Sequence, residues 1–333
     1  MSESKVTAPD PAELAERASK AVGAQIDQVE VLHGGSSSFT YAAQQRGSEP
    51  RKVVIKVAPP GLEPVRNRDV LRQAKVLTGL ADAPGVMVPI VLGTDDGSPP
   101  EIPPMVVMTF VDGESYEPVL RGGNPDVTDA EVTARAFSAA QMLAALQRAD
   151  AGQFEDERET DLEREVGRWE KAFSTVDEGL QGDGRADHIN AALKAGLPEK
   201  LSPVVLHGDY RLGNMQCVGT EIRALIDWEI WSLGDPRLDL AWFLLNSDPR
   251  HPNKKPGGDR MPPVDELANA FEQASGQSVE NLGWFSALVR YKQAAASALI
   301  VKNNRRLARD GVDTASMEEN IPKLLDWAGQ YLA

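Results

Sequence analysis

The chain is best understood from one segment, Leu206-His207-Gly208-Asp209-Tyr210-Arg211-Leu212-Gly213-Asn214, which is followed a dozen residues later by Ile226-Asp227-Trp228-Glu229. Together these segments supply two carboxylates and one carboxamide, Asp209, Asp227 and Asn214. In a phosphoryl-transfer site, one carboxylate takes or orients the proton of the acceptor hydroxyl, while an amide and a second carboxylate hold Mg²⁺ against the nucleotide phosphates. The pattern therefore predicts Asp209 as catalytic base and Asn214 and Asp227 as metal ligands.

The two predicted metal ligands flank a short hairpin. Residues 215–218 and 222–226 have the composition of strands, and residues 219–221 between them have that of a tight turn. Antiparallel pairing makes the outer ends of a hairpin neighbours. We therefore expect Asn214, just before the first strand, and Asp227, just after the second, to reach the same ion.

The loop that carries Asp209 follows an apolar, strand-like run at residues 203–206. Such a run holds a catalytic loop rigidly. His207 in the same loop is a second candidate base. A histidine in this position is more often a packed, hydrogen-bonded support, and this is the role we expect for it.

Composition indicates a globular protein of a reducing cytoplasm. The 333 residues are enough for two lobes. The one cysteine, Cys217, cannot form an internal disulfide, and the four histidines lie too far apart in sequence for a local zinc motif.

Charge and hydropathy argue against two classes of partner. The formal net charge of −15 disfavours nucleic acid, whose binding depends on clustered Lys and Arg. Residues 1–11 lack the apolar run of a signal peptide, and the apolar run at residues 294–301 is too short to cross a bilayer. We therefore expect neither nucleic-acid binding nor membrane insertion. An acidic surface keeps a protein soluble whatever it binds, so the charge does not identify the substrate.

Residues 1–111 are predicted to form a small lobe, in which residues 1–10 are a flexible tail. Helix-forming residues are expected to give helices at residues 12–22 and 68–80. Strand-like runs occupy residues 26–32, 39–44, 52–57, 86–92 and 105–111. Turn residues separate the first three runs, which predicts an antiparallel meander.

Residues 112–333 are predicted to form a larger, mainly helical lobe. Helical patterns cover residues 128–149, 161–176, 185–195, 265–275 and 278–307. Residues 247–263 are rich in Pro, Gly and charge and are expected to form an exposed loop. The fold class that follows is α+β, with a small sheet lobe and a larger helical lobe.

The chain resembles the aminoglycoside phosphotransferase family of small-molecule kinases, and in particular the branch associated with acyl-CoA dehydrogenases. The resemblance runs from about Ile26 to the last helix and is carried by His207-Gly208-Asp209 through Asn214, Ile226-Asp227-Trp228-Glu229, and Leu233-Gly234-Asp235-Pro236-Arg237-Leu238-Asp239-Leu240. It implies a bilobal protein-kinase-like fold, ATP or GTP with Mg²⁺, and phosphorylation of a hydroxyl on a small molecule. Asp209 matches the family's catalytic aspartate, Asn214 and Asp227 match its metal ligands, and Asp239 resembles an aspartate that anchors the catalytic loop.

The resemblance also implies a nucleotide site in the small lobe. Lys56, on the third strand, stands where this fold keeps the lysine that pairs with the α- and β-phosphates. A solvent-facing lysine on an edge strand is the alternative, which its apolar neighbours disfavour. The loop Gly34-Gly35-Ser36-Ser37-Ser38 would cover the phosphates with backbone N–H groups and hydroxyls, although Gly and Ser also form ordinary turns.

Two further features of the small lobe bear on this expectation. The carbonyl of Thr109 and the N–H of Val111 are implied to bind adenine, with a plain core strand as the alternative. Where the family usually has a glutamate on the helix after the lysine strand, this chain has Gln73, which cannot offset the charge of Lys56. Asp69, one turn earlier, is the candidate substitute.

Three functions are compatible with these residues. The leading hypothesis is a kinase that transfers phosphate from ATP or GTP to a small hydroxylated molecule. A nucleotide-binding module that has lost catalysis is favoured by Gln73 but opposed by the retained Asp209, Asn214 and Asp227. A metal-dependent phosphohydrolase would leave the Gly-rich loop, the strand lysine and the hinge without a purpose.

The sequence does not identify the acceptor. Residues 154–192 and 247–263 are expected to form the walls of its site, and an antibiotic, an amino alcohol, a sugar and a hydroxyacyl compound all stay open. Antibiotic resistance does not follow from the family, because fold-level analogy does not transfer a substrate. Oligomeric state and the choice between ATP and GTP are also not indicated.

Overall fold

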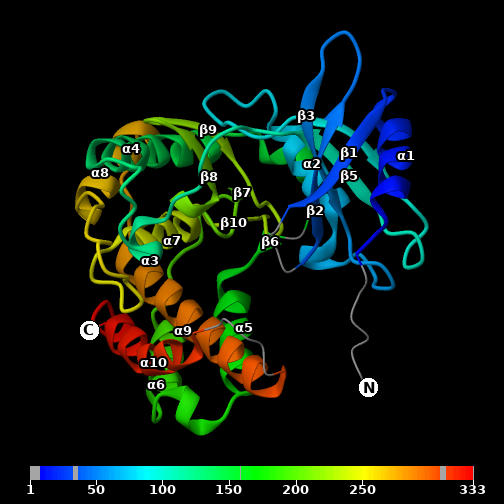
Figure 1. Ribbon diagram of the computed structural model, residues 1–333. Helices are drawn as coiled ribbons and strands as arrows, with labels where there is room; N and C mark the ends of the chain where they lie inside the picture. Colours follow the sequence, from blue (N-terminus) through cyan, green and yellow to red (C-terminus); the bar gives the residue numbers. More distant parts are fainter. Residues whose placement is uncertain (1–7, 33–36, 158, 308–312, 333) are drawn as a thin grey trace. The chain divides into compact units, whose positions relative to one another are not determined.

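The computed structural model describes residues 8–32, 37–157, 159–307 and 313–332 (Figure 1). The chain divides into two compact units. The first comprises Met1–Glu114, Asn214–Val218 and Ile222–Trp231, and the second comprises Ser115–Gly213, Gly219–Glu221 and Ser232–Ala333. Most of the hairpin thus groups with the first unit, whereas the expected lobes were residues 1–111 and 112–333. The assignment of nucleotide binding to residues 1–111 and of catalysis to residues 112–333 stays a prediction.

A five-stranded sheet of order β1-β2-β3-β5-β4 is the centre of the first unit. Its strands are β1 (Ile26–Leu32), β2 (Phe39–Gln45), β3 (Arg51–Val57), β4 (Val91–Asp95) and β5 (Met105–Thr109). All neighbouring strands pair antiparallel. In β3 the side chains of Val53, Ile55 and Val57 are fully buried, as the two-residue period of a strand requires. The antiparallel meander predicted for the first three strands is confirmed.

The strand expected at residues 86–92 is wrong in its position. The strand observed in this region, β4, begins only at Val91. Pro89 precedes it, and proline has no N–H to give to a sheet ladder, so regular pairing starts beyond it.

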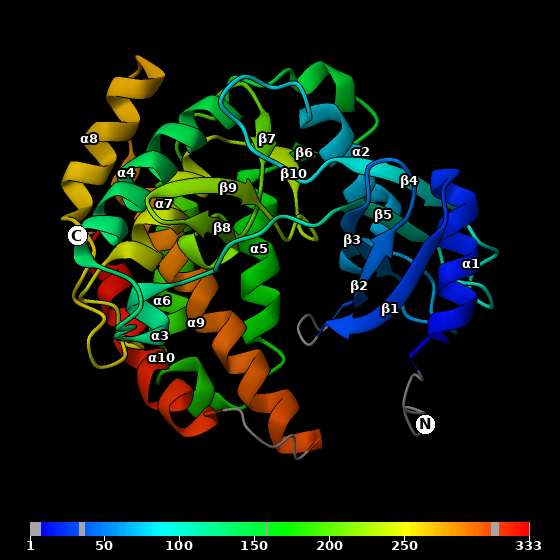
Figure 2. The ribbon, with the colours of Figure 1, turned by 45° about the horizontal axis from the view of Figure 1, so that its top comes forward.

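Two helices and one 3₁₀ turn accompany the sheet: α1 (Pro11–Val22), η1 (Arg66–Arg68) and α2 (Val70–Leu80). The Asp10 side chain caps the start of α1, and Gly23, with φ of 70°, ends it. Figure 2 shows α1 running beside β1 and β4. Its buried face, Leu14 and Ala18, joins the apolar cluster that includes Ile55 and Val107 of the sheet.

The predicted hairpin is present as β8 (Met215–Val218) and β9 (Glu221–Leu225), after the 3₁₀ turn η4 (Leu212–Asn214). Backbone hydrogen bonds tie it to the rest of the first unit. Glu114 and Cys217 exchange two such bonds of 2.9 Å, and the Leu225 N–H donates to the Met87 carbonyl at 2.8 Å. Each strand of the hairpin is therefore hydrogen-bonded to another segment of the first unit.

The second unit is mainly helical. Its α-helices are α3 (Pro118–Arg121), α4 (Asp129–Leu146), α5 (Leu162–Phe173), α6 (Arg185–Ala195), α7 (Arg237–Ser247), α8 (Val264–Ser275), α9 (Leu282–Leu307) and α10 (Thr314–Gly329). Short 3₁₀ turns are η2 (Ala151–Phe154) and η3 (Glu178–Gln181), and β6 (Glu159–Thr160), β7 (Val204–Leu206) and β10 (Ser232–Gly234) form a small sheet of order β6-β10-β7. Two of the predicted helices start at side-chain caps: Thr128 and Glu131 form a capping box on α4, and Asp161 caps α5.

The core of the second unit lies around α9. This helix contributes Phe285, Leu288 and Tyr291, and α10 contributes Leu324 and Leu325, to a cluster that also includes residues of α5, α6 and α7. Figure 1 shows α9 and α10 side by side. Because α9 packs on α5, α6, α7 and α10, it forms the centre of this core.

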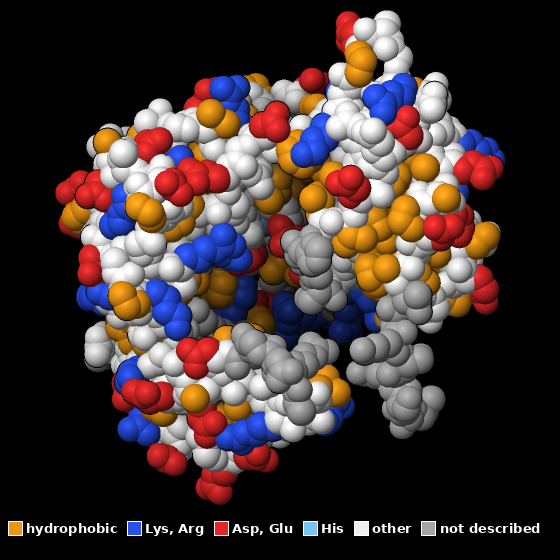
Figure 3. Space-filling view, viewed as in Figure 1, with side chains coloured by type: hydrophobic (Ala, Val, Ile, Leu, Met, Phe, Trp, Pro, Cys, Tyr) orange, Lys and Arg blue, Asp and Glu red, His pale blue; other side chains and the backbone are white. Residues whose placement is uncertain are grey.

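Two surface properties bear on possible partners. Within the described ranges, each helix is either too short or too polar to span a bilayer. On the face shown in Figure 3, acidic and basic side chains are interspersed.

Candidate active site

Lys56 lies on an inner strand of the sheet. In the sheet, Lys56 is paired with Thr40 of β2 on one side and with Val106 of β5 on the other. The alternative of a solvent-facing lysine on an edge strand is therefore wrong. The side chain is 13% exposed, and its Nζ lies 3.4 Å from Oδ1 of Asp227. Lys56 and Asp227, which are 171 positions apart in the chain, are thus brought together within the first unit.

The two predicted metal ligands lie at adjoining ends of the hairpin. The carbonyl of Asn214 accepts a hydrogen bond of 2.8 Å from the N–H of Ile226, the residue before Asp227. The Asn214 side chain is buried, and Asp227 has a left-handed backbone with φ of 68°. Left-handed aspartates are uncommon and are held in place by their surroundings.

The donor atoms of this pair fit Mg²⁺, which prefers carboxylate and amide oxygens. No cluster of three or more His, Cys, Asp or Glu side chains suited to a metal ion occurs in the described part of the chain. Magnesium in nucleotide sites is usually held by one or two protein ligands together with phosphates and water. The pair Asn214 and Asp227 matches that kind of site.

The Gly-rich loop is only partly within the described residues. Gly34, Gly35 and Ser36 lie outside them. Ser37 and Ser38 are buried, and the Ser37 hydroxyl is hydrogen-bonded to the Glu229 carboxylate. The Ser38 hydroxyl has no hydrogen-bond partner in the described structure. Its contact with a phosphate stays a prediction.

The expected adenine-binding segment follows β5. Thr109 ends this strand and pairs with Val53 of β3. Its N–H donates to the Ile90 carbonyl at 2.9 Å, and its Oγ1 accepts from the Ile90 N–H at 2.9 Å. Adenine binding by the Thr109 carbonyl and the Val111 N–H stays a prediction.

The described contacts of Gln73 and Asp69 do not involve Lys56. The Asp69 carboxylate accepts a hydrogen bond of 2.9 Å from the Arg72 N–H and so caps α2. The Gln73 amide donates to the Asn67 carbonyl at 3.4 Å. Lys56 instead forms its ion pair with Asp227.

Asp209 is surrounded by hydrogen-bond donors of the second unit. The indole N–H of Trp242, on α7, donates to its Oδ1 at 2.7 Å. The Nε–H of Arg211 lies 3.1 Å from both carboxylate oxygens. These contacts fix the orientation of the carboxylate, which is the first requirement of a general base.

The backbone of the Asp209 loop is held by two charged residues. The Asp239 carboxylate, at the start of α7, accepts from the N–H of His207 at 2.6 Å and from the N–H of Gly208 at 2.9 Å. Lys292, on α9, donates to the Gly208 carbonyl at 3.1 Å. Burial raises the pKa of Asp239 and lowers that of Lys292.

His207 contacts the same loop from within. Its side chain is fully buried, and Nδ1 accepts a hydrogen bond of 3.2 Å from the N–H of Asp209. A buried imidazole that bonds the local backbone has the geometry of a support rather than of an exposed base.

Glu117 completes the surroundings of Asp209, and sequence reasoning missed it. Its carboxylate is 1% exposed, accepts from the Gly213 N–H at 2.9 Å, and lies 3.5 Å from Arg211 Nη1. Burial raises its pKa to about 7, an effect that Arg211 and the Gly213 N–H oppose and Asp209 reinforces. No local motif marks this residue, because it lies 96 positions before Gly213.

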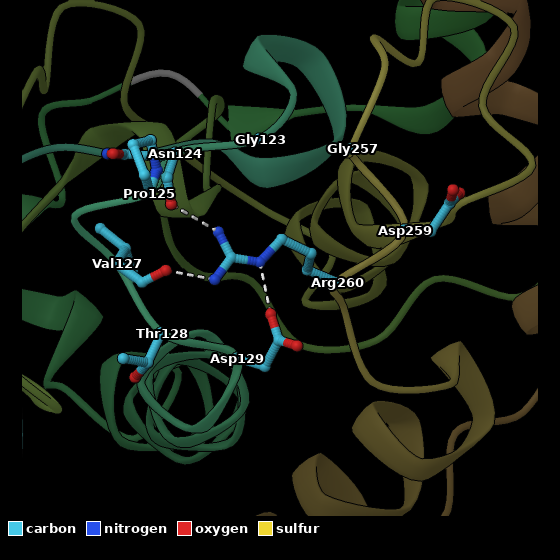
Figure 4. A pocket seen from close by; sticks show the side chains of 9 residues that line it. All are labelled: Gly123, Asn124, Pro125, Val127, Thr128, Asp129, Gly257, Asp259 and Arg260. Carbon is cyan, nitrogen blue, oxygen red and sulfur yellow. Dashed lines mark hydrogen bonds and ion pairs between the residues drawn. The ribbon is translucent and has the colours of Figure 1, made fainter.

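A pocket of about 670 Å³ lies elsewhere in the second unit (Figure 4). It is lined by Gly123, Asn124, Pro125, Val127, Thr128, Asp129, Gly257, Asp259 and Arg260. The loop expected to wall the acceptor site thus contributes to it, but Asp209 is not part of the lining. The Arg260 guanidinium donates hydrogen bonds to the Asp129 carboxylate at 2.5 Å and to the Asn124 carbonyl at 3.0 Å. It therefore links the loop of residues 248–263 to the segment before α4.

The chain is similar to known proteins in sequence and in fold. The family model described as the phosphotransferase enzyme family matches residues 28–285. Acyl-CoA dehydrogenase family member 10 of Mus musculus is 27% identical over 199 residues, which are 59% of this chain and 18% of that protein. The Arabidopsis thaliana protein named probable acyl-CoA dehydrogenase IBR3 is 28% identical over 230 residues, 64% of this chain and 27% of that protein. The chain spans about a fifth to about a quarter of these curated relatives.

Two solved structures have the same fold. A Ralstonia eutropha JMP134 protein classed as an aminoglycoside phosphotransferase superposes with a TM-score of 0.76 at 19% identity, over 97% of this chain and 98% of its own. Spectinomycin phosphotransferase APH(9)-Ia, in complex with ADP and spectinomycin, superposes with a TM-score of 0.64 at 12% identity. The match covers 98% of this chain and 99% of that protein. The fold is thus the kinase-like one with an antiparallel sheet lobe and a helical lobe. With the family match over residues 28–285, this chain belongs to the phosphotransferase enzyme family.

Proposed function

We propose that the chain transfers the γ-phosphate of ATP or GTP to a hydroxyl group of a small molecule. Two contacts carry this proposal. Lys56 forms an ion pair with Asp227, and the N–H of Ile226, the residue before Asp227, donates a hydrogen bond to the Asn214 carbonyl. This supports the proposal because a cationic side chain lies close to residues whose oxygen atoms are of the kind that Mg²⁺ prefers. Membership of the phosphotransferase family and the ADP-bound spectinomycin phosphotransferase support a nucleotide co-substrate.

In the proposed reaction, residues 1–111 bind the nucleotide and residues 112–333 supply the acceptor site. Lys56 neutralises the α- and β-phosphates, and Asn214 and Asp227 hold Mg²⁺. When bound, the ion neutralises charge that develops on the phosphates. Ser37 and Ser38, with Gly34, Gly35 and Ser36 before them, cover the phosphates from the Gly-rich loop, and Thr109 and Val111 bind the base.

Asp209 is proposed to accept the proton of the acceptor hydroxyl. As the bond forms between the hydroxyl oxygen and the γ-phosphorus, the bond to the β–γ bridging oxygen breaks and the nucleoside diphosphate leaves. Trp242 and Arg211 aim the Asp209 carboxylate, while Asp239 and Lys292 fix the loop that carries it. Precise placement of such a base is worth several orders of magnitude in rate.

Asp209→Ala tests the assignment. We expect phosphate transfer to be abolished while Mg²⁺-dependent nucleotide binding is retained, because Asp209 lies outside the unit that holds Lys56 and Asp227. Binding is measured by calorimetry with ADP. Transfer is measured after a thermal-shift screen of hydroxylated metabolites in the presence of a non-hydrolysable nucleotide and Mg²⁺.

Three outcomes separate the candidate functions. Undiminished turnover in Asp209→Ala would refute its role as base. Nucleotide binding by the wild type without hydrolysis or transfer would identify a nucleotide-binding module, which the neutral Gln73 favours. Release of inorganic phosphate that needs no acceptor would identify a phosphohydrolase.

A further inference from the structure

Helix α2 contacts the segment after Asp227 through Arg72 and Trp231. The guanidinium of Arg72 donates from Nη2 to the Trp231 carbonyl at 2.6 Å. In return, the Trp231 indole N–H donates to the Arg72 carbonyl at 3.0 Å. The guanidinium carbon also lies 4.4 Å from the centre of the indole ring. Each residue therefore holds the backbone of the other, and the two side chains stack.

This pair fixes one end of a short segment whose other end is held by the hairpin. Residues 227–231 connect Asp227 to Trp231, and Ile226 is bonded to the Asn214 carbonyl. Trp231 is 1% exposed, so the anchor is shielded from water. Burial strengthens a charge-assisted hydrogen bond because water cannot compete for the donor.

The backbone at Asp227 is the part of this segment that needs support. An aspartate with φ of 68° occupies a sparsely populated conformation, which persists only when the surrounding structure imposes it. Lys56 contacts the Asp227 carboxylate but cannot set the backbone. Gln73, on α2, is neutral and donates to the Asn67 carbonyl, whereas Arg72 of the same helix donates to the Trp231 carbonyl.

We propose that Arg72 and Trp231 are positioning residues for the Asp227 carboxylate, and that they couple α2 to the metal-binding end of the site. The inference rests on the proposed function, because it assigns Asp227 to Mg²⁺ and nucleotide. The pair does not contact the Asp227 carboxylate but orients it through the backbone of residues 227–231. Partners that hydrogen-bond a metal ligand directly contribute about 10- to 100-fold to metal affinity, and we expect the lower end of this range for a pair that acts through the backbone.

The first test compares Mg²⁺-dependent ADP binding in Arg72→Ala with the wild type by calorimetry. We expect an affinity for ADP that is about 10-fold lower with Mg²⁺ and nearly unchanged without it. Arg68→Ala removes the same side chain one turn earlier and is expected to bind as the wild type does. An equal loss with and without Mg²⁺, or no loss, overturns the proposal.

Two conservative variants keep the proposal testable if Arg72→Ala does not fold. Arg72→Lys keeps the charge but not the planar group that both stacks and donates. Trp231→Phe keeps a ring for stacking but loses the N–H given to the Arg72 carbonyl. Both should reproduce the Mg²⁺-specific loss in smaller measure, and wild-type binding by both variants contradicts the coupling.

The second test needs no ligand and separates this inference from the proposed function. Hydrogen exchange of peptides that cover residues 226–231 is measured in the metal-free, nucleotide-free protein. Arg72→Ala should speed exchange there about 10-fold, and Arg68→Ala should not, because only the former removes the anchor. An unchanged exchange rate of residues 226–231 in Arg72→Ala would refute the proposed coupling. Failure of the wild type to bind nucleotide, with faster exchange in Arg72→Ala, refutes the proposed function alone.

Discussion

Replacement of Glu117 by Gln should remove a pH dependence from the stability of the protein. The Glu117 carboxyl is 1% exposed, and burial raises its pKa from 4.5 to about 7. Between these two values the folded protein binds a proton that the unfolded chain releases. The contribution of Glu117 to the free energy of unfolding therefore falls as the pH rises from about 4.5 to 7 and stays low above 7.

The size of the effect follows from the two pKa values. A pKa difference of one corresponds to about 1.36 kcal/mol, so a rise from 4.5 to about 7 makes the folded state about 3 kcal/mol less stable at pH 8 than it would be with a neutral group. Gln has the shape of the protonated carboxyl and carries no charge at any pH. The free energy of unfolding of Glu117→Gln should therefore lack this decline, even if loss of the Arg211 contact changes its absolute value.

Urea unfolding at pH 5, 6, 7 and 8 measures the difference. The free energy of unfolding of the variant minus that of the wild type should rise by about 2.5 kcal/mol from pH 5 to pH 8, because the unfolded carboxyl is already partly ionised at pH 5. Glu163→Gln, an exposed glutamate in the first turn of α5, is the matched control and should follow the wild type. Parallel curves for Glu117→Gln and the wild type would show that the Glu117 carboxyl is ionised at ordinary pH and would refute the reasoning.

Two further predictions concern the proposed reaction. Lys56→Ala should weaken ADP binding by about 10-fold, because a charge-assisted contact contributes about 1.5–3 kcal/mol. Arg51→Ala, which removes an exposed cationic side chain from the same strand, should bind as the wild type in the same titration. Equal affinities would remove Lys56 from the site. Trp242→Phe should lower kcat about 10-fold or more without changing the KM for nucleotide, since it deletes the hydrogen bond to Asp209. Trp284→Phe, which loses an indole bond to the Leu193 carbonyl in the core, is its control, and equal kcat values in the two variants would argue against orientation by Trp242.

The parts of the fold that sequence predicts are those with strong local signals. The helix at residues 185–195 and the strand at residues 26–32 have the predicted limits, because turn residues bound each of them. The start of β4 was missed because the apolar pattern of residues 86–92 outweighed a proline inside it. Trp242 could have been found, since it lies three residues after Asp239 on α7 and therefore shares its helix face.

The groups that hold the site were beyond prediction because their partners are distant in sequence. Glu117 meets Gly213 across 96 positions, and Arg72 meets Trp231 across 159. Neither contact leaves a periodic or spaced pattern in the residues near it. Motifs identify the groups that perform chemistry, but a buried carboxylate or a stacked guanidinium looks like any other until the chain has folded.

The position of Lys56 shows how topology decides a chemical question. In chain order β4 would follow β3, and a simple meander would set the lysine strand beside it. The observed order β1-β2-β3-β5-β4 instead inserts β5 between them, so that Lys56 is opposite Val106 and Val53 is opposite Thr109. The strand that ends in the expected adenine-binding segment thus lies directly beside the lysine strand. A nucleotide that contacts the end of β5 with its base can therefore extend along β3 toward Lys56.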